Sequence, residues 1–265
     1  LSFALPIMER LYQQEHGQAA QGGGTTVTRR TGGGGRRQPG QPRVLVMAPT
    51  RELARQVHSE FSTLGKPWLR TVCIYGGAPY EPQERALREG VDVVVGTPGR
   101  IIDHLERGNL ALAAVDFVVL DEADQMLNFG FAEDMEKILK AVPAGRPHQT
   151  CLFSATMPYW VRKIARQQMQ PDHVIVDLIG EQDNQSAADL RHLAIGCHPR
   201  HKFGVLQDVM DVYSAGGRTI VFADTKAEAT EVATSSALRE ACGVLHGDIE
   251  QRQREITLAS FRQGK

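Results

Sequence analysis

Short apolar runs alternate along the chain with longer stretches in which apolar residues recur every three or four positions. The short runs are nearly continuous in Val, Ile and Leu, which is typical of strands buried on both faces of a parallel sheet. We expect strands at 44–47, 71–75, 92–95, 117–120, 150–153, 174–178, 192–197, 219–222 and 244–246. We expect helices at 51–64, 100–106, 126–141, 161–169, 202–213 and 227–239. This alternation predicts a doubly wound α/β fold.

Each end of the chain carries a further helical stripe. The first stripe consists of Leu1, Ala4, Leu5, Met8, Leu11 and Tyr12. The last one contains Ile256, Leu258 and Phe261. In open α/β sheets such helices normally connect two strands, and here each has a strand on one side at most. We therefore expect the sequence to be a piece of a longer protein.

Two polar stretches interrupt the pattern. Residues 17–42 hold repeated glycines, two Arg-Arg pairs and no acidic residue, so they cannot bury enough apolar surface to fold. We expect a disordered surface insert there, and the arginine pairs leave open an accessory arm that touches RNA phosphates. Residues 180–189 are polar and lack periodicity, which favours a linker between domains at 1–179 and 190–265.

Composition and charge set only wide limits. Hydrophobic residues make up 42% of the chain and charged residues 23%, as in ordinary globular proteins. The formal net charge of −1 neither favours nor excludes a nucleic-acid partner, because a balanced total can hide a basic cleft. The four scattered cysteines form no CxxC pair and are expected to be buried, reduced thiols of an intracellular protein. No apolar run approaches the ~20 residues of a membrane helix.

Asp121 and Glu122 follow directly on the apolar run 117–120. In α/β folds ligands bind at the carboxyl ends of the strands, so this is the position of a site. Two adjacent carboxylates at the end of a buried strand need a partner that satisfies them. A bound Mg²⁺ would do so, and the second carboxylate could orient and deprotonate water. Acidic residues also cap helices, and that interpretation stays open at this point.

Two predicted helix starts and one glycine pair also follow strands. Thr50 precedes the helix that begins at Arg51, and Thr97-Pro98-Gly99-Arg100 places a cap residue and a proline before another helix. Helix N-termini present free N–H groups that suit phosphate oxygens, and the arginines add charge there. Gly76-Gly77 would let a phosphodiester backbone come close. Each feature alone is an ordinary cap or turn, but together on one sheet edge they predict a groove for a nucleic-acid backbone.

Three further segments look like helix caps. Ser154-Ala155-Thr156 closes a strand, and its hydroxyls either cap a helix or bond the acids of a neighbouring strand end. Thr225 and Glu228 have the spacing of a capping box. Asp248 with Gln251 has a similar spacing. For these segments a purely structural role is sufficient.

The ordered series of motifs resembles that of DEAD-box RNA helicases over essentially the whole chain outside the Gly/Arg insert. The motifs are Pro49-Thr50-Arg51-Glu52-Leu53-Ala54, Gly76-Gly77, Thr97-Pro98-Gly99-Arg100, Asp121-Glu122-Ala123-Asp124, Ser154-Ala155-Thr156, Ile220-Val221-Phe222-Ala223-Asp224-Thr225 and Gln251-x-x-Arg254. Finer features, such as Leu245-His246-Gly247-Asp248-Ile249, are similar to the nucleolar RNA helicase II/Gu subgroup, which has plant nucleolar and chloroplast relatives.

The resemblance implies two RecA-like domains with parallel sheets, the first nearly complete and the second truncated, which close over ATP and RNA. ATP and Mg²⁺ are the implied cofactors, with Asp121 holding Mg²⁺ through water and Glu122 activating the attacking water. Asp124 would join Ser154, Ala155 and Thr156 in coupling nucleotide state to domain closure. The implied RNA-binding residues, which would make sequence-independent backbone contacts, are Pro49, Thr50, Arg51, Gly76, Gly77, Thr97, Pro98, Gly99, Arg100, Thr225, Gln251 and Arg254.

Leu1-Ser2-Phe3 resembles the residues that directly follow the family's Gly-Lys-Thr phosphate loop. We therefore expect that loop, the glutamine motif and the second domain's arginine fingers to lie outside this sequence. The expected function of the parent protein is ATP-dependent RNA unwinding or RNP remodelling in ribosome biogenesis or RNA processing, with no hydrolysis by these residues alone. The nucleus or nucleolus is the favoured compartment, the chloroplast and cytoplasm stay open, and no membrane or particular protein partner is indicated.

Two other classes of protein share parts of this pattern. A non-catalytic RNA-binding clamp or scaffold would share the groove, but it would not need the pair Asp121-Glu122. A dinucleotide-dependent oxidoreductase would need a GxGxxG turn directly after a strand, and the glycines of the insert follow none of the expected strands.

Overall fold

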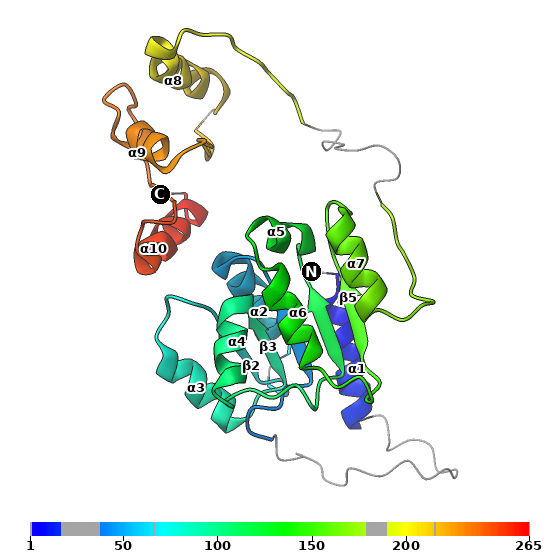
Figure 1. Ribbon diagram of the computed structural model, residues 1–265. Coiled ribbons are helices and arrows are strands. Elements are labelled where there is room, and N and C mark those ends of the chain that lie inside the picture. The colour runs from blue at the N-terminus through cyan, green and yellow to red at the C-terminus, as the bar shows by residue number, and fades with distance from the viewer. Residues whose placement is uncertain (1, 17–37, 66, 179–189, 215, 265) are drawn as a thin grey trace. The chain divides into compact units, whose positions relative to one another are not determined.

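The computed structural model describes residues 2–16, 38–65, 67–178, 190–214 and 216–264. The chain forms two compact units, Leu1–Ile175 and Val176–Lys265 (Figure 1). The insert residues 17–37 and the predicted linker 180–189 lie outside the described residues, so both interpretations stay predictions. None of the described helices is long and apolar enough to cross a membrane.

The larger unit is built on a parallel sheet of five strands in the order β2-β3-β1-β4-β5. The strands are β1 (Val44–Met47), β2 (Thr71–Ile74), β3 (Val93–Gly96), β4 (Phe117–Leu120) and β5 (Gln149–Leu152). The helices are α1 (Ala4–His16), α2 (Arg51–Leu64), α3 (Tyr80–Glu89), α4 (Pro98–Glu106), α5 (Ala123–Asn128), α6 (Ala132–Lys140) and α7 (Tyr159–Gln168). Strands and helices alternate as the doubly wound fold requires.

The sheet is buried on both faces because successive side chains of each strand point to opposite sides. Val44 and Val46 of β1 pack with α1 and α2, in a core that Phe61 and Leu11 complete. Leu45 and its neighbours on the other face pack with α3 to α7. All four residues of β1, β3 and β4 are buried, which explains why these runs are continuous in apolar residues.

The strands are paired so that their carboxyl ends lie level. Met47 of β1 stands opposite Gly96 of β3 and Leu120 of β4, and Leu120 stands opposite Leu152 of β5. The turns that follow β1, β2, β3, β4 and β5 therefore meet along one edge of the sheet. These are the turns that carry the predicted site residues.

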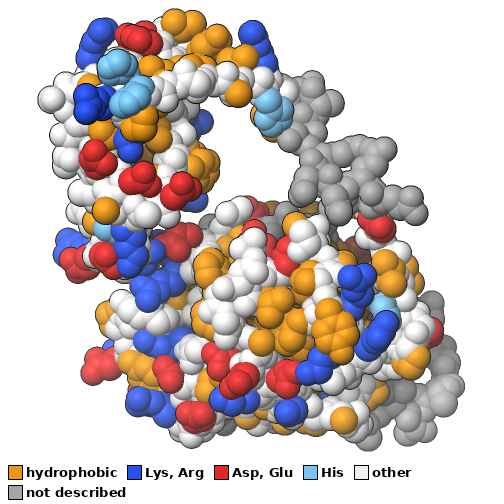
Figure 2. All heavy atoms as spheres, turned by 45° about the horizontal axis from the view of Figure 1, so that its top comes forward, with side chains coloured by type: hydrophobic (Ala, Val, Ile, Leu, Met, Phe, Trp, Pro, Cys, Tyr) orange, Lys and Arg blue, Asp and Glu red, His pale blue; other side chains and the backbone are white. Residues whose placement is uncertain are grey.

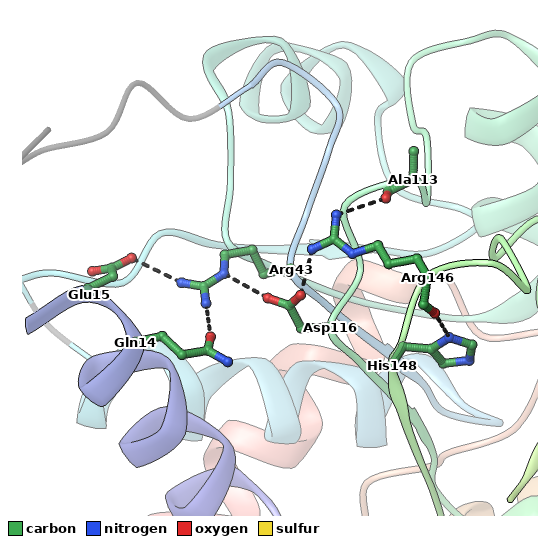
Figure 3. Close-up of polar contacts among 7 residues, drawn as sticks. All are labelled: Gln14, Glu15, Arg43, Ala113, Asp116, Arg146 and His148. Carbon is green, nitrogen blue, oxygen red and sulfur yellow. Dashed lines mark hydrogen bonds and ion pairs between the residues drawn. The ribbon is translucent and has the colours of Figure 1, made fainter. Parts of the chain in front are cut away.

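At the opposite edge, a polar cluster ties α1 to the strand starts (Figure 3). Asp116 accepts from Arg43 Nε at 3.1 Å and from Arg146 Nη2 at 2.6 Å. Arg43 also pairs with Glu15 at 3.2 Å and donates to Gln14. One carboxylate thus joins the residues before β1 and β4 to those before β5, and Arg43 joins them to the end of α1.

Most of the predicted elements of the larger unit are confirmed, and several need correction. The helix expected over 126–141 is two helices, α5 and α6, which are separated by a turn whose Gly130 has a φ of +80°. Helix α3 was not predicted, because it buries little beyond Gln83 and Leu87 and so has only a narrow apolar stripe. In α1, Leu5 and Tyr12 are exposed, and Phe3 and Ile7 complete the buried stripe in their place.

The smaller unit contains helices and, within its described residues, no strand. They are the short 3-10 helix η2 (Pro199–His201) and helices α8 (Lys202–Tyr213), α9 (Lys226–Thr234) and α10 (Gln251–Arg262). Helix α8 is as predicted, whereas α9 ends five residues earlier than the expected 227–239.

The strands expected at 192–197, 219–222 and 244–246, and the one at 174–178, are wrong for this structure. An apolar run becomes a strand only where neighbouring strands take up its N–H and C=O groups and cover its side chains. Here the runs lie open to solvent, with Leu178 91% exposed and Phe222 92% exposed. The second parallel sheet of the predicted fold is therefore not formed by the described residues.

The expectation that all four cysteines are buried is also wrong. Cys73 and Cys151 are half-buried, and Cys197 and Cys242 are exposed.

Candidate functional site

The acidic motif follows β4 and is held between its two neighbours. Asp121 N donates to the carbonyl oxygen of Met47 in β1 at 3.0 Å. Ala123 N donates to the carbonyl oxygen of Phe153, directly after β5, also at 3.0 Å. Asp121 is half-buried, Glu122 is exposed and Asp124 is buried. The three carboxylates therefore differ in solvent exposure, and they lie at the carboxyl edge of the sheet, as the sequence predicts.

The backbone at Glu122 is left-handed, with φ 51° and ψ 53°. Among the described residues it is the only one other than glycine with a positive φ. A side chain with a Cβ adopts this conformation at a cost of about 1–2 kcal/mol. Such strain is concentrated at functional sites, where the surrounding structure holds a residue in an otherwise unfavourable position.

The pKa of Asp121 is raised above its usual range. Burial is the main cause and the adjacent Glu122 carboxylate adds to it, while a backbone hydrogen bond at Glu122 acts in the opposite direction. Both causes disfavour a lone negative charge, and a nearby cation would offset both. Within the described residues, His, Cys, Asp and Glu form no group of three that could hold a metal. Carboxylate oxygens are ligands that suit Mg²⁺, which binds to one or two carboxylates and keeps several waters.

Asp124 joins this motif to the turn after β5. Its Oδ2 accepts from the Thr156 hydroxyl at 2.8 Å and from Thr156 N at 3.1 Å, and Ser154 Oγ donates to the Thr156 carbonyl at 2.6 Å. Burial acts to raise the pKa of Asp124, but hydrogen bonds, chiefly those from Thr156, outweigh it and lower the pKa. Of the two interpretations of Ser154-Ala155-Thr156, the structure has the bond to a neighbouring acid, and Ala155 lies exposed in the turn.

The turns after β1 and β2 meet at Arg51 and Gly77. Thr50 caps α2, and its hydroxyl accepts from Leu53 N at 3.2 Å, while the preceding Pro49 is buried. The guanidinium of Arg51 lies against Gly77, where an added Cβ would be 2.7 Å from Arg51 Nη1. Gly77 also has a φ of +80°, so its backbone conformation favours glycine, and a larger residue there would displace the Arg51 guanidinium.

The turn after β3 brings Arg100 to the same place. Thr97 occupies the cap position of α4 without a side-chain capping bond, which corrects the predicted capping role, and Pro98 follows at the first helical position. Gly99 has open space around it. Arg100 Nη1 donates to the carbonyl oxygen of Ala78, next to the glycine pair, at 3.4 Å. The turns predicted to form a groove are therefore neighbours.

In the smaller unit the predicted residues contact one another in two groups. Thr225 caps α9 by accepting from Glu228 N at 3.1 Å, as the capping box predicts. Asp248 does not cap α10; its carboxylate pairs with Lys226 Nζ at 2.6 Å, and Glu250 holds the cap position. The lysine lowers the pKa of this exposed aspartate.

The second group lies in α10, where Arg254 donates to Gln251 and Gln251 Nε2 donates to Glu255 at 3.2 Å. The Gln-x-x-Arg motif thus forms a row along one helix. Over the lower part of the surface shown in Figure 2, blue and red side chains are interspersed, so no broad basic area marks a nucleic-acid site there. A groove for a nucleic-acid backbone would therefore depend on the individual turns after the strands and on Arg51 and Arg100.

Comparison with known proteins shows the family to which the chain belongs. Residues 1–164 match the DEAD/DEAH box helicase family and residues 201–265 match the helicase conserved C-terminal domain. The chain belongs to the DEAD/DEAH box helicase family. Its relatives include DEAD-box ATP-dependent RNA helicase 3B, chloroplastic, of Zea mays (48% identical, over 100% of this chain and 33% of the relative). They also include Nucleolar RNA helicase 2 of Rattus norvegicus (44% identical, over 99% and 32%).

The chain spans about a third of the length of these two relatives, which are 33% and 32% covered. Among solved structures, it is similar to a DEAD box protein from the hyperthermophile Methanococcus jannaschii. The identity is 35%, the covered shares are 84% of this chain and 59% of that one, and the TM-score is 0.48.

Proposed function

We propose that this chain contributes the water-activating acids and part of the RNA-binding surface to an ATP-dependent RNA helicase, one that unwinds RNA duplexes or remodels RNPs. The observation that carries the proposal is the placement of Asp121, Glu122 and Asp124 at the end of β4, with Asp124 bonded to Thr156. A clamp that only binds RNA would have no use for a strained glutamate beside a desolvated aspartate.

In this proposal Asp121 holds Mg²⁺ through water, and the ion supplies the positive charge that offsets phosphate oxygens. Glu122 is exposed at the motif's tip, where its carboxylate can orient the attacking water and accept a proton from it. Asp124, Ser154, Ala155 and Thr156 couple nucleotide state to domain closure. The bond between Asp124 and Thr156 supports this role, because it joins the acidic turn to the turn that leads into α7.

RNA would bind by its sugar-phosphate backbone, without reading of bases. Pro49, Thr50 and Arg51 supply one turn, Gly76 and Gly77 the second, and Thr97, Pro98, Gly99 and Arg100 the third. The contacts Arg51–Gly77 and Arg100–Ala78 support a common surface. Thr225, Gln251 and Arg254 would form the corresponding surface of the smaller unit.

The 265 residues contain no Gly-Lys-Thr or Gly-Lys-Ser phosphate loop. Without a loop that grips the β- and γ-phosphates, the acids have no substrate positioned before them. We therefore propose that this chain alone hydrolyses no ATP. Appreciable magnesium-dependent, RNA-stimulated release of phosphate from ATP by the purified chain would refute this statement.

A chimera tests the activity itself. The 265 residues replace their counterparts in the Zea mays relative, which they match along their whole length at 48% identity. We expect RNA-stimulated ATP hydrolysis by the chimera. In it, Glu122→Gln should abolish turnover while ATP and RNA still bind, because only the water-activating carboxylate is lost. Unchanged turnover in that variant would exclude the role of Glu122.

The process and compartment are proposals too. The name of the Zea mays relative refers to the chloroplast, and the name of the Rattus norvegicus relative refers to the nucleolus. We propose a nucleolar or plastid role in ribosome biogenesis or RNA processing, the nucleolus being favoured. A fluorescent fusion of the natural full-length protein tests this, and a purely cytoplasmic signal would contradict it.

A further inference from the structure

Side chains of α3 and α4 form hydrogen bonds with the turn of residues 75–79, which contains Gly76-Gly77. The acceptors are the backbone carbonyl oxygens of Tyr75, Ala78 and Pro79. Gln83 Nε2 donates to the first and last of these at 3.3 and 3.2 Å, and Arg100 Nη1 donates to the middle one at 3.4 Å. Three carbonyl oxygens, whose partial negative charge would repel a phosphate, are thereby engaged within the protein.

Gln83 is only 5% exposed and is fixed in turn by His104, which is 0% exposed. His104 Nε2 lies 3.5 Å from Gln83 Oε1. Because an amide oxygen can only accept, this contact assigns the ring proton to Nε2. Burial and then the charge of Arg100 lower the pKa of His104 to about 4, so the imidazole is neutral at neutral pH. The other charged groups that face it are Asp103, Glu84 and Arg107.

Tyr80 completes the support. Its ring stacks on His104 with centroids 4.5 Å apart and an angle of 17°. The guanidinium carbons of Arg100 and Arg107 lie 5.4 and 4.6 Å from the centroid of the Tyr80 ring. Asn109 Nδ2 donates to the Tyr80 hydroxyl at 2.8 Å. The Tyr80 ring therefore contacts both His104, which lies against Gln83, and Arg100, which donates to the Ala78 carbonyl.

We propose that Gln83 is a positioning residue for RNA binding, which keeps the Gly76-Gly77 turn in a shape that a sugar-phosphate backbone can approach. The stack of Tyr80 on His104 keeps Gln83 and Arg100 aligned with that turn. This inference rests on the proposed function, because it takes the turn to be an RNA contact. Gln83 is buried, so its effect on RNA is indirect and passes through the carbonyls of Tyr75 and Pro79.

The test measures binding of a short fluorescein-labelled oligouridylate to the 265-residue chain by fluorescence anisotropy over a range of salt concentrations. Gln83→Leu keeps the bulk of the side chain and removes both donors. We expect about fivefold weaker binding, the size of one lost hydrogen-bonded contact. We also expect a shallower dependence of log K on log salt, because a displaced turn would move the guanidiniums of Arg51 and Arg100, which contact it, away from the phosphates.

A purely structural role would lower the unfolding midpoint and leave the salt slope of the folded protein unchanged, so the slope separates the two roles. Tyr80→Phe keeps the ring and should bind RNA like the unmodified chain, whereas Tyr80→Ala should bind about as weakly as Gln83→Leu. If Gln83→Leu does not fold, this matched pair decides, and equal affinities of the two Tyr80 variants overturn the inference.

Arg100→Ala separates failure of the inference from failure of the proposed function. If the unmodified chain binds no RNA, or Arg100→Ala binds as well as it does, the proposed RNA surface fails and the inference with it. If Arg100→Ala weakens binding while Gln83→Leu keeps both the affinity and the salt slope of the unmodified chain, only the inference is overturned.

Discussion

Replacing Glu122 by glycine is expected to stabilise the larger unit. The residue holds a φ of 51°, and this conformation costs a residue with a Cβ about 1–2 kcal/mol. Glycine adopts it without strain but gains freedom in the unfolded chain, which offsets about 0.5–1 kcal/mol. The net gain should be about 0.5–1 kcal/mol, or roughly 1–4 °C in unfolding midpoint for a unit of this size.

The charge of Glu122 has to be separated from its backbone conformation. Glu122→Gln removes the charge, including its repulsion of Asp121, but keeps the Cβ and hence the strain. The difference in unfolding free energy between the glycine and glutamine variants is therefore the measured quantity. Urea unfolding can be followed by tryptophan fluorescence, because both tryptophans, Trp68 and Trp160, lie in the larger unit.

If the glycine variant is no more stable than the glutamine variant, the left-handed turn stores no appreciable strain and the reasoning fails. If it is more stable, the chain gives up stability to hold a carboxylate at the end of β4. Residues at functional sites commonly show this trade-off.

Three further outcomes are expected. Thr156→Val should lower the unfolding free energy by about 1–2 kcal/mol, because it leaves the buried Asp124 carboxylate one donor short; urea unfolding measures this, and an unchanged midpoint would refute it. His104 has a pKa of about 4 in the fold against an ordinary 6.5, so the unfolded chain binds more protons between these values. Stability should therefore fall as the pH drops from 6.5 toward 4, by up to about 3 kcal/mol, and His104→Phe should remove this part of the pH slope. Asp116→Ala should destabilise the larger unit by about 1 kcal/mol and more at low salt than at high salt, since it leaves Arg43 and Arg146 facing each other; equal loss at both salt concentrations would contradict the electrostatic cause.

The sequence predicts which residues of the candidate site lie close together, because these residues directly follow recognisable strands. The strands before Asp121 and Thr97 are short, buried and recognisable, and the strand before Ser154 is short and partly exposed. Parallel pairing brings their carboxyl ends to one edge. The bond between Asp124 and Thr156 was one of two interpretations, and only the structure chooses between them.

Gln83 was missed because its signal is weak in sequence. It lies in α3, whose exposed face is rich in charged residues and whose buried face is short, so no apolar period marks the helix. From sequence alone, a glutamine on such a helix is expected to be exposed to solvent. Only the structure shows that Gln83 contacts the carbonyls of Tyr75 and Pro79 and the ring of His104. The strands expected in the smaller unit failed for the opposite reason. Runs such as 219–222 are apolar enough, but β-structure depends on partners that local sequence does not supply.

The cluster around Arg43 has a consequence for the segment between α1 and β1. Glu15 stands just before residues 17–37 and Arg43 stands shortly after them, and the two side chains are paired at 3.2 Å. Glu15 and Arg43 are thus held side by side, so lengthening the chain between them would cost only about 0.6 kcal/mol for each doubling of its length. We therefore expect a tag or a short spacer inserted between Glu15 and Arg43 to leave the acids that follow β4 undisturbed, because those acids lie at the opposite edge of the sheet.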